Sequence, residues 1–208
     1  MELTEANEIV TAPEWSDHVE VISPSRLRVG TLDELLRVTP EMLDWWFANM
    51  DRPGYMDFHP LDHEEFAWSR GKEPGRYVGA THLTHQRYGG TGPLMRAEIT
   101  FLPPEDRFDP ALLEEHGVGF ALSAVIHLLD ELGHPEPHET GHFVHIGIAR
   151  DYGTELRNCW WLNTDERSDF ERMTTARFRH VHEEFGYLAG FLPALYAERT
   201  KPRASSGS

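Results

Sequence analysis

A single long helix dominates the C-terminal part of the sequence. Strong helix formers extend from Asp169 to Arg199, Ser168 is a candidate N-cap, and Pro193 is expected to kink the segment near its end. The apolar residues occur on nearly every side of this helix: Phe170, Met173, Phe178, Val181, Phe185, Leu188, Phe191, Leu192 and Leu195. Because such a helix has to bury several faces, other elements are expected to surround it.

Residues 75–163 have the pattern of antiparallel β structure. Two strand-like runs within 76–102 flank a turn rich in glycine and proline, which predicts a hairpin. Residues 142–163 predict two further strands joined by a short turn, whereas residues 119–132 fit either a buried strand or a helix.

Two short helices are expected before these strands. The sequence Thr-Pro-Glu at 39–41 offers a hydroxyl N-cap, a first-turn proline and an acid near the positive end of the helix dipole, so a helix is predicted to begin there. A second short helix over residues 59–68 would place His59 and His63 one turn apart.

Together these elements predict an α+β fold in which a curved antiparallel sheet grips the long C-terminal helix and leaves a cavity between them. The chain has 208 residues, which is enough for one domain with its own core. We expect an N-terminal extension over residues 1–38 on the outside of the domain, a single domain over 39–199 and a disordered polar tail over 200–208.

The charge balance argues against several classes of partner. The chain carries 35 Asp and Glu against 19 Lys and Arg, a formal net charge of -16, so nucleic acid and acidic membrane surfaces would be repelled. No apolar stretch is long enough to span a bilayer.

The single cysteine, Cys159, is expected to be a buried small hydrophobe. The N-terminus has no signal character, which predicts a cytoplasmic protein. A homodimer is compatible with this sequence.

Histidine occurs 13 times, and some of these histidines are spaced as metal ligands. His180 and Glu184 lie four residues apart on the long helix, so both side chains can reach one metal ion, although a solvated pair on a charged helix face is the alternative. His63, with His59 four residues before it, would supply the third ligand that a catalytic zinc needs. Glu98 is the candidate fourth ligand, yet strict alternation along its predicted strand sends this side chain to solvent.

Several segments together resemble the 2,4-diacetylphloroglucinol hydrolase and phloretin hydrolase family, over roughly residues 40–198. They are Tyr55 followed by His59-Pro60-Leu61-Asp62-His63, a downstream strand glutamate, the strand pair HIGIARDYGTELRNCWWLN, and the terminal helix HVHEEFGYLAGFLPALY. The resemblance implies a Bet v 1-like helix-grip fold. It also implies a zinc enzyme that hydrolyses the carbon–carbon bond between an acyl group and an electron-rich phenol ring, with a small acylated phenol as its substrate.

The same resemblance assigns roles to individual residues. The metal ligands fall on His63, Glu98, His180 and Glu184, with His59 as the alternative to Glu98. The catalytic tyrosine falls on Tyr55, and the catalytic histidine falls on His145, with His142 as the alternative. The implied reaction needs a zinc ion to polarise the acyl carbonyl or activate water, and an acid to protonate the departing ring carbon.

The sequence departs from the family at two positions expected to contact substrate. Phe66 stands where the family has an asparagine, and Trp160 or Trp161 stands where it has a tyrosine, which favours a more apolar substrate. Phe66 and three tryptophans, Trp45, Trp46 and Trp68, could line an apolar pocket for a planar ring, but ordinary packing in the core is the favoured interpretation for each of them.

Two other functions are compatible with the same residues. A carrier would hold an apolar aromatic ligand in the cavity without turning it over, and it would need no metal. A zinc-dependent ester or amide hydrolase would keep the metal and cleave a different bond.

Overall fold

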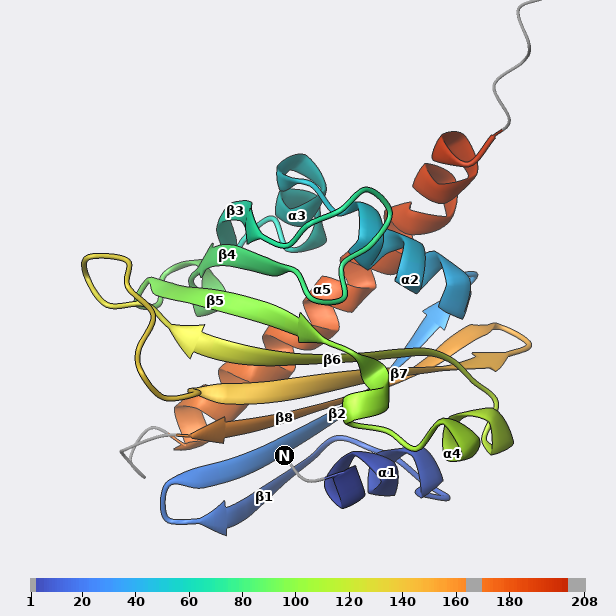
Figure 1. The fold of residues 1–208 in the computed structure, drawn as a ribbon, viewed down its shortest axis with the longest axis horizontal. Helices are drawn as coiled ribbons and strands as arrows, with labels where there is room; N and C mark the ends of the chain where they lie inside the picture. Colours follow the sequence, from blue (N-terminus) through green and yellow to red (C-terminus); the bar gives the residue numbers. More distant parts are fainter. Residues whose placement is uncertain (1–2, 164–169, 202–208) are drawn as a thin grey trace, which may run out of the picture.

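Eight antiparallel strands form one curved sheet in the computed structural model, which describes residues 3–163 and 170–201, without the side chains of 170–173 (Figure 1). The strands are β1 (His18–Ser23), β2 (Arg26–Leu36), β3 (His63–Arg70), β4 (Thr81–Gln86), β5 (Met95–Leu102), β6 (Val118–Leu128), β7 (Gly141–Arg150) and β8 (Gly153–Asn163), in the order β1-β2-β8-β7-β6-β5-β4-β3. The helices are α1 (Leu3–Thr11), α2 (Pro40–Asn49), α3 (Arg52–Phe58), α4 (Pro110–Glu115) and α5 (Phe170–Arg199), with the 3-10 turns η1 (Tyr88–Gly90) and η2 (Pro104–Asp106).

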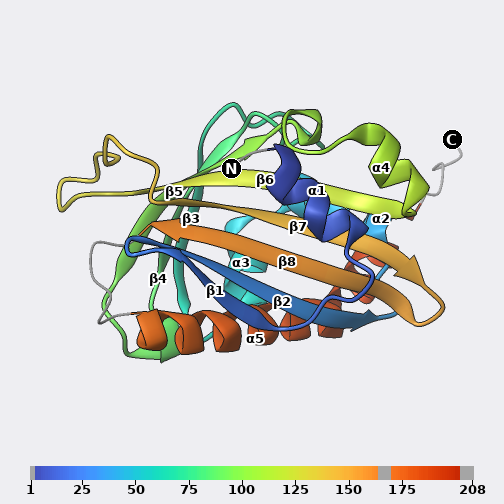
Figure 2. The ribbon, with the colours of Figure 1, turned by 90° about the horizontal axis from the view of Figure 1, so that it is seen from below.

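Helix α5 runs along one face of the sheet, the inner face, and the strands curve around it (Figure 2). It contacts β2, η1, α2 and α3. Four of its apolar side chains are at most 1% exposed: Val181, Phe185, Leu188 and Leu192. The prediction of a long helix contacted from several sides is therefore confirmed, and the helix continues through Pro193 to Arg199. The predicted N-cap Ser168 and the predicted first residue Asp169 lie outside the described residues.

Strands β1 and β2 are part of the sheet, so these residues are not the outer extension that was predicted over residues 1–38. β2 pairs with β8 along its whole length, and β1 pairs with β2 as the edge strand. The reason is the alternation at the start of β2, where Leu27 and Val29 are fully buried and Arg26 and Arg28 are not. Helices α1 and α4 lie on the outer face of the sheet, opposite α5 (Figure 1). Residues 202–208 of the predicted tail lie outside the described residues.

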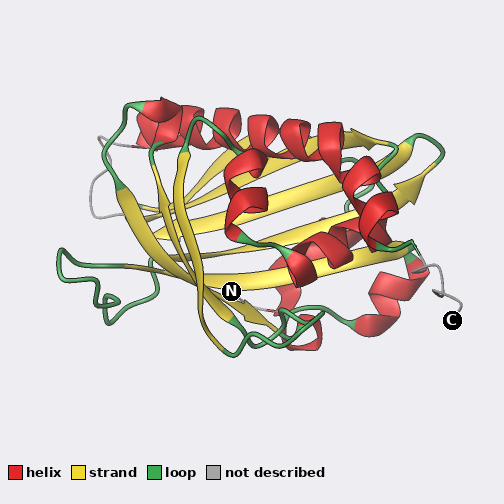
Figure 3. Ribbon diagram, turned by 90° about the horizontal axis from the view of Figure 1, so that it is seen from above, coloured by secondary structure: helices red, strands yellow, loops and turns green. Residues whose placement is uncertain are grey.

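Short helices α2 and α3 lie on the same side of the sheet as α5 (Figure 3). The N-cap of α2 is Thr39, as predicted, and its hydroxyl accepts a hydrogen bond from the Met42 amide at 3.3 Å. The predicted helix over residues 59–68 is wrong. Asp51 caps α3 by accepting from the Gly54 amide at 2.9 Å, so that helix comes earlier, and His63 begins strand β3.

The predicted strands after residue 75 are confirmed. β4 and β5 form the expected hairpin, and β7 and β8 pair across the turn at 151–152. The ambiguous segment at 119–132 is largely strand, because β6 pairs on both sides with β5 and β7. Within the described residues, no helix is long and apolar enough to cross a membrane.

Alternation along β7 and β8 separates their side chains between the two faces. His145 and Trp160 line a cavity on the inner face, and Asn158 lies opposite His145 in the strand pairing. His142 and Cys159 belong to the outer side, beneath α1 and α4. Cys159 is fully buried, as predicted, and burial raises the pKa of its thiol.

Lowering the pH from 7 to 5 is expected to destabilise the protein in part through His142. This imidazole is 6% exposed and stacks on Trp161, and burial lowers its pKa from 6.5 to about 3. The folded protein therefore keeps it neutral, while the unfolded chain takes up a proton below pH 6.5, so stability falls as the pH drops from 6.5 toward 3. At pH 5 the loss is about 2 kcal/mol.

The His142→Phe variant is expected to lose less stability between pH 7 and pH 5 than the wild type does. Urea unfolding at the two pH values measures this difference in the free energy of unfolding. If the variant and the wild type lost the same amount, His142 would not be a source of the acid sensitivity.

Candidate active site and metal centre

A cavity of about 130 Å³ lies between α5 and the inner face of the sheet. Much of the cavity wall is apolar. Its apolar aromatic residues are Phe47, Phe58, Phe101, Phe143 and Trp160. The titratable side chains that line it are Tyr55, His63, His82, His145, Arg177, His180 and Glu184. A planar aromatic ligand is the kind of molecule that such a wall accommodates.

None of the four aromatic residues considered for the pocket, Trp45, Trp46, Phe66 and Trp68, lines this cavity. Trp45 and Trp46 line a separate surface cleft between α2, α3 and the end of α5. Phe66 stacks on the Tyr55 ring with centroids 4.9 Å apart, and Trp68 packs against Phe66, so both support the cavity wall from behind. The favoured interpretation of these residues as core is therefore confirmed: Trp46 and Phe66 belong to the main core, and Trp45 and Trp68 pack against it.

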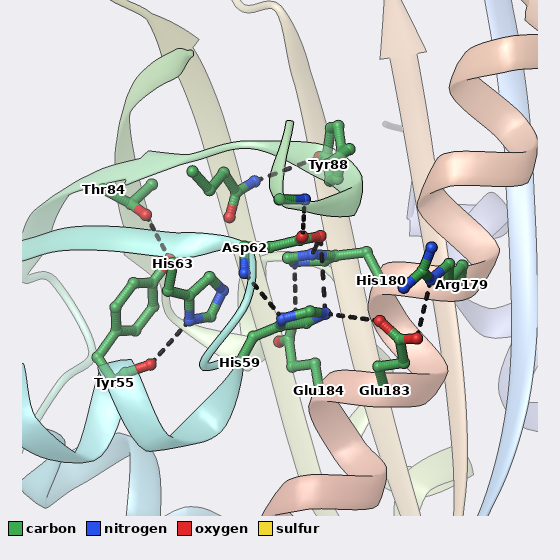
Figure 4. A network of polar contacts seen from close by, with 12 residues as sticks. Tyr55, His59, Asp62, His63, Thr84, Tyr88, Arg179, His180, Glu183 and Glu184 are labelled. Atoms are coloured by element: carbon green, nitrogen blue, oxygen red, sulfur yellow. Dashed lines mark hydrogen bonds and ion pairs between the residues drawn. The ribbon is translucent and has the colours of Figure 1, made fainter. Parts of the chain in front are cut away.

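Three of the predicted metal ligands come together at the cavity wall. His63 at the start of β3 and the pair His180 and Glu184 on α5 place their ligand atoms within 4.8 Å of one another (Figure 4). Two imidazoles and one carboxylate form a donor set used by catalytic zinc sites, which keep a coordination position for water or substrate. The residues present therefore fit a zinc ion.

Hydrogen bonds hold both imidazoles in the orientation that a metal site needs. His63 Nδ1 donates to the Tyr55 carbonyl oxygen at 2.8 Å, so its Nε2 carries the lone pair. His180 Nδ1 lies 2.9 Å from Asp62 Oδ2, and its Nε2 lies 2.9 Å from Glu184 Oε2 (Figure 4). Carboxylate and carbonyl partners of this kind fix the tautomer of a metal-binding histidine.

Burial and pairing set the charges of the three donors. Burial lowers the pKa of His63 to about 4, so its imidazole is neutral near pH 7. Burial alone would lower the pKa of His180, but its hydrogen bonds to Asp62 and then to Glu184 raise it. Burial alone would raise the pKa of Glu184, but its hydrogen bond to His180 lowers it. Metal binding by these donors is coupled to release of the proton that His180 and Glu184 share, because a metal ligand must be deprotonated.

His59, the alternative fourth ligand, lies behind these donors. It forms a second cluster with Asp62 and His180 and stacks on the His180 ring with centroids 4.5 Å apart. The Asp62 amide donates to His59 Nδ1 at 3.1 Å, so the proton of a neutral His59 is on Nε2, which lies 3.3 Å from Glu183 Oε2. With its lone pair already engaged, His59 supports His180 and Asp62 from behind.

Glu98, the predicted fourth ligand, is not part of this site. Its β5 neighbours Ala97 and Ile99 line the cavity, so alternation directs Glu98 to the other face of the sheet. There its carboxylate pairs with Arg70 at 3.0 Å. The ligand set carried over from the family resemblance is wrong at this position, and the alternation rule is right.

Tyr55 lies against the metal-binding residues. Its ring stacks on the His63 ring with centroids 3.9 Å apart, and its hydroxyl makes a short hydrogen bond with Thr84 Oγ1. Tyr55 is 5% exposed, and burial raises the pKa of its phenol well above the usual value. The hydroxyl therefore stays protonated and is available as a hydrogen-bond or proton donor at the cavity wall.

His145 is held in one tautomer by Asn158. The amide nitrogen of Asn158 donates to Thr31 Oγ1 at 3.1 Å and to Asp33 Oδ2 at 3.0 Å, which leaves its Oδ1 as the acceptor for His145 Nδ1 at 2.7 Å. His145 Nε2 then carries the lone pair, and burial lowers the pKa of the ring to about 4. The imidazole is therefore neutral, and its free nitrogen can accept a proton. His142, the alternative, points away from the cavity.

Three functional residues were not found from the sequence. Asp62 and Asn158 act through the histidines that they orient, and Arg177 enters the cavity one turn before His180. Arg177 lies on the same helix face as His180 and Glu184, so its spacing from them could have identified it as a cavity residue. The partners of Asp62 and Asn158 are 118 and 13 residues away in the chain, so no local pattern identifies them.

Comparison with known proteins agrees with this architecture. The family model for the DAPG hydrolase PhiG domain matches residues 21–197. Two crystal structures of major latex-like protein 151 from Panax ginseng are similar, at 9% and 8% identity, each covering 80% of this chain and 97% of that chain, with TM-scores of 0.56 and 0.53. A protein from Mycobacterium smegmatis, 12% identical over 92% of this chain and 98% of that chain, has a TM-score of 0.47. No curated protein sequence matches. The latex-like protein shows the fold alone, which is the predicted Bet v 1-like helix-grip fold.

Proposed function

The chain belongs to the DAPG hydrolase family, and on this basis we propose that it is a zinc-dependent hydrolase of acylated phenols. In this reaction water cleaves the carbon–carbon bond between the acyl group and an electron-rich, phloroglucinol-like ring. The observation that carries the proposal is the meeting of His63, His180 and Glu184 with Tyr55 and His145 in one largely apolar cavity. When bound, zinc supplies a Lewis acid that polarises the acyl carbonyl or makes water more acidic.

The protein's own residues supply the proton transfers. The leaving group is a ring carbon, which departs only when it has been protonated, so the reaction needs a positioned acid. Tyr55 has that role in our proposal, because its hydroxyl is protonated and held by Thr84 at the cavity wall. His145 Nε2 accepts the proton that water loses as it attacks the acyl carbon. Asn158 keeps this nitrogen unprotonated by binding the proton on Nδ1.

The apolar wall favours the ring of the substrate. Of the two tryptophans that could stand in place of the family tyrosine, Trp160 lines the cavity, whereas Trp161 faces the other side of the sheet, so our proposal uses Trp160. An indole donates a hydrogen bond through Nε1 but, unlike a phenol, cannot accept one. We therefore expect weaker selection for polar ring substituents than a tyrosine would give.

The zinc-loaded protein is expected to release a carboxylic acid and the deacylated phenol from acylphloroglucinols or from phloretin. Turnover should require free hydroxyls ortho or para to the acyl group, because only these let the ring carbon take up a proton in a keto tautomer. Product analysis by liquid chromatography, with the matching methyl ethers as control substrates, tests this requirement. Tight binding without turnover by fully zinc-loaded protein would show a carrier, and hydrolysis of esters or amides alone would show a different zinc hydrolase.

A further inference from the structure

One cation in the cavity has no role in the proposed chemistry. Arg177 on α5 is 8% exposed and lines the cavity, and it is the only arginine or lysine among the described residues that does so. Its guanidinium lies over the Tyr88 ring at 5.0 Å and over the Trp160 ring at 5.8 Å. Tyr88 itself lies beside His180 (Figure 4).

Among the described residues, Arg177 lacks the carboxylate partner that a buried arginine usually has. Other arginines of the protein pair with carboxylates: Arg28, Arg52, Arg70, Arg87, Arg150, Arg157 and Arg179. No ion pair joins Arg177 to a carboxylate in the part of the chain that the structure describes. Two aromatic faces stabilise a cation only in part, and a buried charge without a counter-ion is unfavourable.

The position of Arg177 relative to the metal-binding residues is fixed by the helix. At 1.5 Å per residue, Arg177 precedes His180 by about 4.5 Å and Glu184 by about 10 Å along the axis. A substrate whose acyl carbonyl lies at His180 and Glu184 would therefore extend its ring toward Arg177. Glu184, whose carboxylate would repel an anion, is farther from Arg177 along the helix than His180 is.

We propose that Arg177 forms an anion-binding subsite of the cavity, which recognises an oxyanion on the substrate. This proposal rests on the proposed function: the bound group is the ionised ring hydroxyl of an acylated phenol. A guanidinium donates charge-assisted hydrogen bonds to such an oxygen, and it is suited to the role because it remains charged at all relevant pH values.

The same contact would favour cleavage. The ring carbon takes a proton from Tyr55, which converts the phenolate into a neutral keto form, and water adds to the acyl carbon while its proton goes to His145. The carbon–carbon bond then breaks, and its electron pair returns to the ring, which becomes aromatic again with the negative charge on the ring oxygen. The carboxylic acid leaves, and His145 returns its proton to Tyr55. Arg177 stabilises that oxygen anion before and after cleavage.

Equilibrium binding tests the subsite without any turnover. The probes are 4-nitrophenol at a pH at which it is ionised, 4-nitroanisole as a neutral analogue of the same shape, and 4-nitrobenzoate, each followed by quenching of tryptophan fluorescence. The zinc content of every protein sample is measured first. Wild-type protein is expected to bind the phenolate at least about tenfold more tightly than the ether.

Arg177→Gln is expected to abolish the preference for the phenolate while binding the ether as the wild type does. Arg177→Lys should keep part of the preference because it keeps the charge. Arg199→Gln, which removes an exposed cation from the same helix, should behave as the wild type. Equal affinity for the ether in all variants excludes a merely structural effect of the loss of Arg177.

The outcomes separate this inference from the proposed function. A wild type that prefers neither 4-nitrophenolate nor 4-nitrobenzoate to the ether, or an Arg177→Gln variant that keeps the preference, would overturn the anion subsite even if acylphenols are hydrolysed. A preference lost in Arg177→Gln would support it even if no hydrolysis occurs. If the wild type bound 4-nitrobenzoate more tightly than 4-nitrophenolate, and Arg177→Gln lost this binding, the result would support the subsite and assign a carboxylate as the bound oxyanion.

Discussion

Replacing Glu184 with glutamine is expected to abolish zinc retention and, with it, hydrolysis of acylated phenols. Glu184 is one of three donors that lie within 4.8 Å of one another, and it is the only one that carries negative charge. An amide is a weaker ligand than a carboxylate and does not offset the charge of the cation. Loss of a supporting residue typically weakens metal affinity about 10–100-fold, so loss of a ligand should exceed that range.

Elemental analysis of the purified variants measures this effect directly. His180→Ala should behave as Glu184→Gln does, and Asp62→Asn should retain zinc with weaker affinity because Asp62 only orients His180. Glu98→Gln is the matched control: it makes the same chemical change in a carboxylate that pairs with Arg70 on the other face of the sheet. Undiminished zinc in Glu184→Gln would show that the site is wrong, and lost zinc in Glu98→Gln would restore Glu98 to the ligand set.

The second large effect is expected for Tyr55→Phe, which should lower kcat by on the order of a hundredfold or more. This is the usual scale for removing a positioned proton donor. The ring and its stacking on His63 remain in the variant, so zinc should be retained. The lost hydrogen bond leaves Thr84 Oγ1 without its Tyr55 partner in a buried position, which costs about 1 kcal/mol of stability. Steady-state kinetics, zinc content and thermal unfolding measure these three quantities.

Tyr77→Phe provides the control for Tyr55→Phe. Tyr77 is equally buried at 5% exposure and donates a hydrogen bond to Asp44 at 3.0 Å, but it does not line the cavity. Its replacement should cost comparable stability and leave kcat unchanged. If both variants lost activity in proportion to stability, Tyr55 would have a structural role and the proton donor would have to be another group.

The sequence predicts most of this architecture because its strongest signals are local. The all-round apolar helix, the β4–β5 hairpin and the strands around 151–153 follow from periodicity and turn residues in short windows. Strand β2 was missed because its partner, β8, is more than a hundred residues away in the chain. The α3 helix was misplaced because the helix start formed by Asp51 and Pro53 was not used in the prediction.

The candidate site shows the same division between local and distant information. The helical spacing of His180 and Glu184 was sufficient to pair them, but only the fold brings His63 to them. At Glu98 the alternation of β5 predicted the observed outward position, and the family resemblance predicted the opposite. Asn158 has no sequence signal, because its function depends on a hydrogen bond across two strands.

The central claim is that this protein hydrolyses acylated phenols with a metal held by His63, His180 and Glu184. The most direct test measures acid and phenol released from an acylphloroglucinol by one protein sample as purified, after chelation, and after re-addition of one equivalent of zinc. We expect turnover in the first state, its loss in the second and its recovery in the third, with a lower melting temperature only in the second. Equal turnover in all three states, or binding without product in the zinc-loaded state, would contradict the claim.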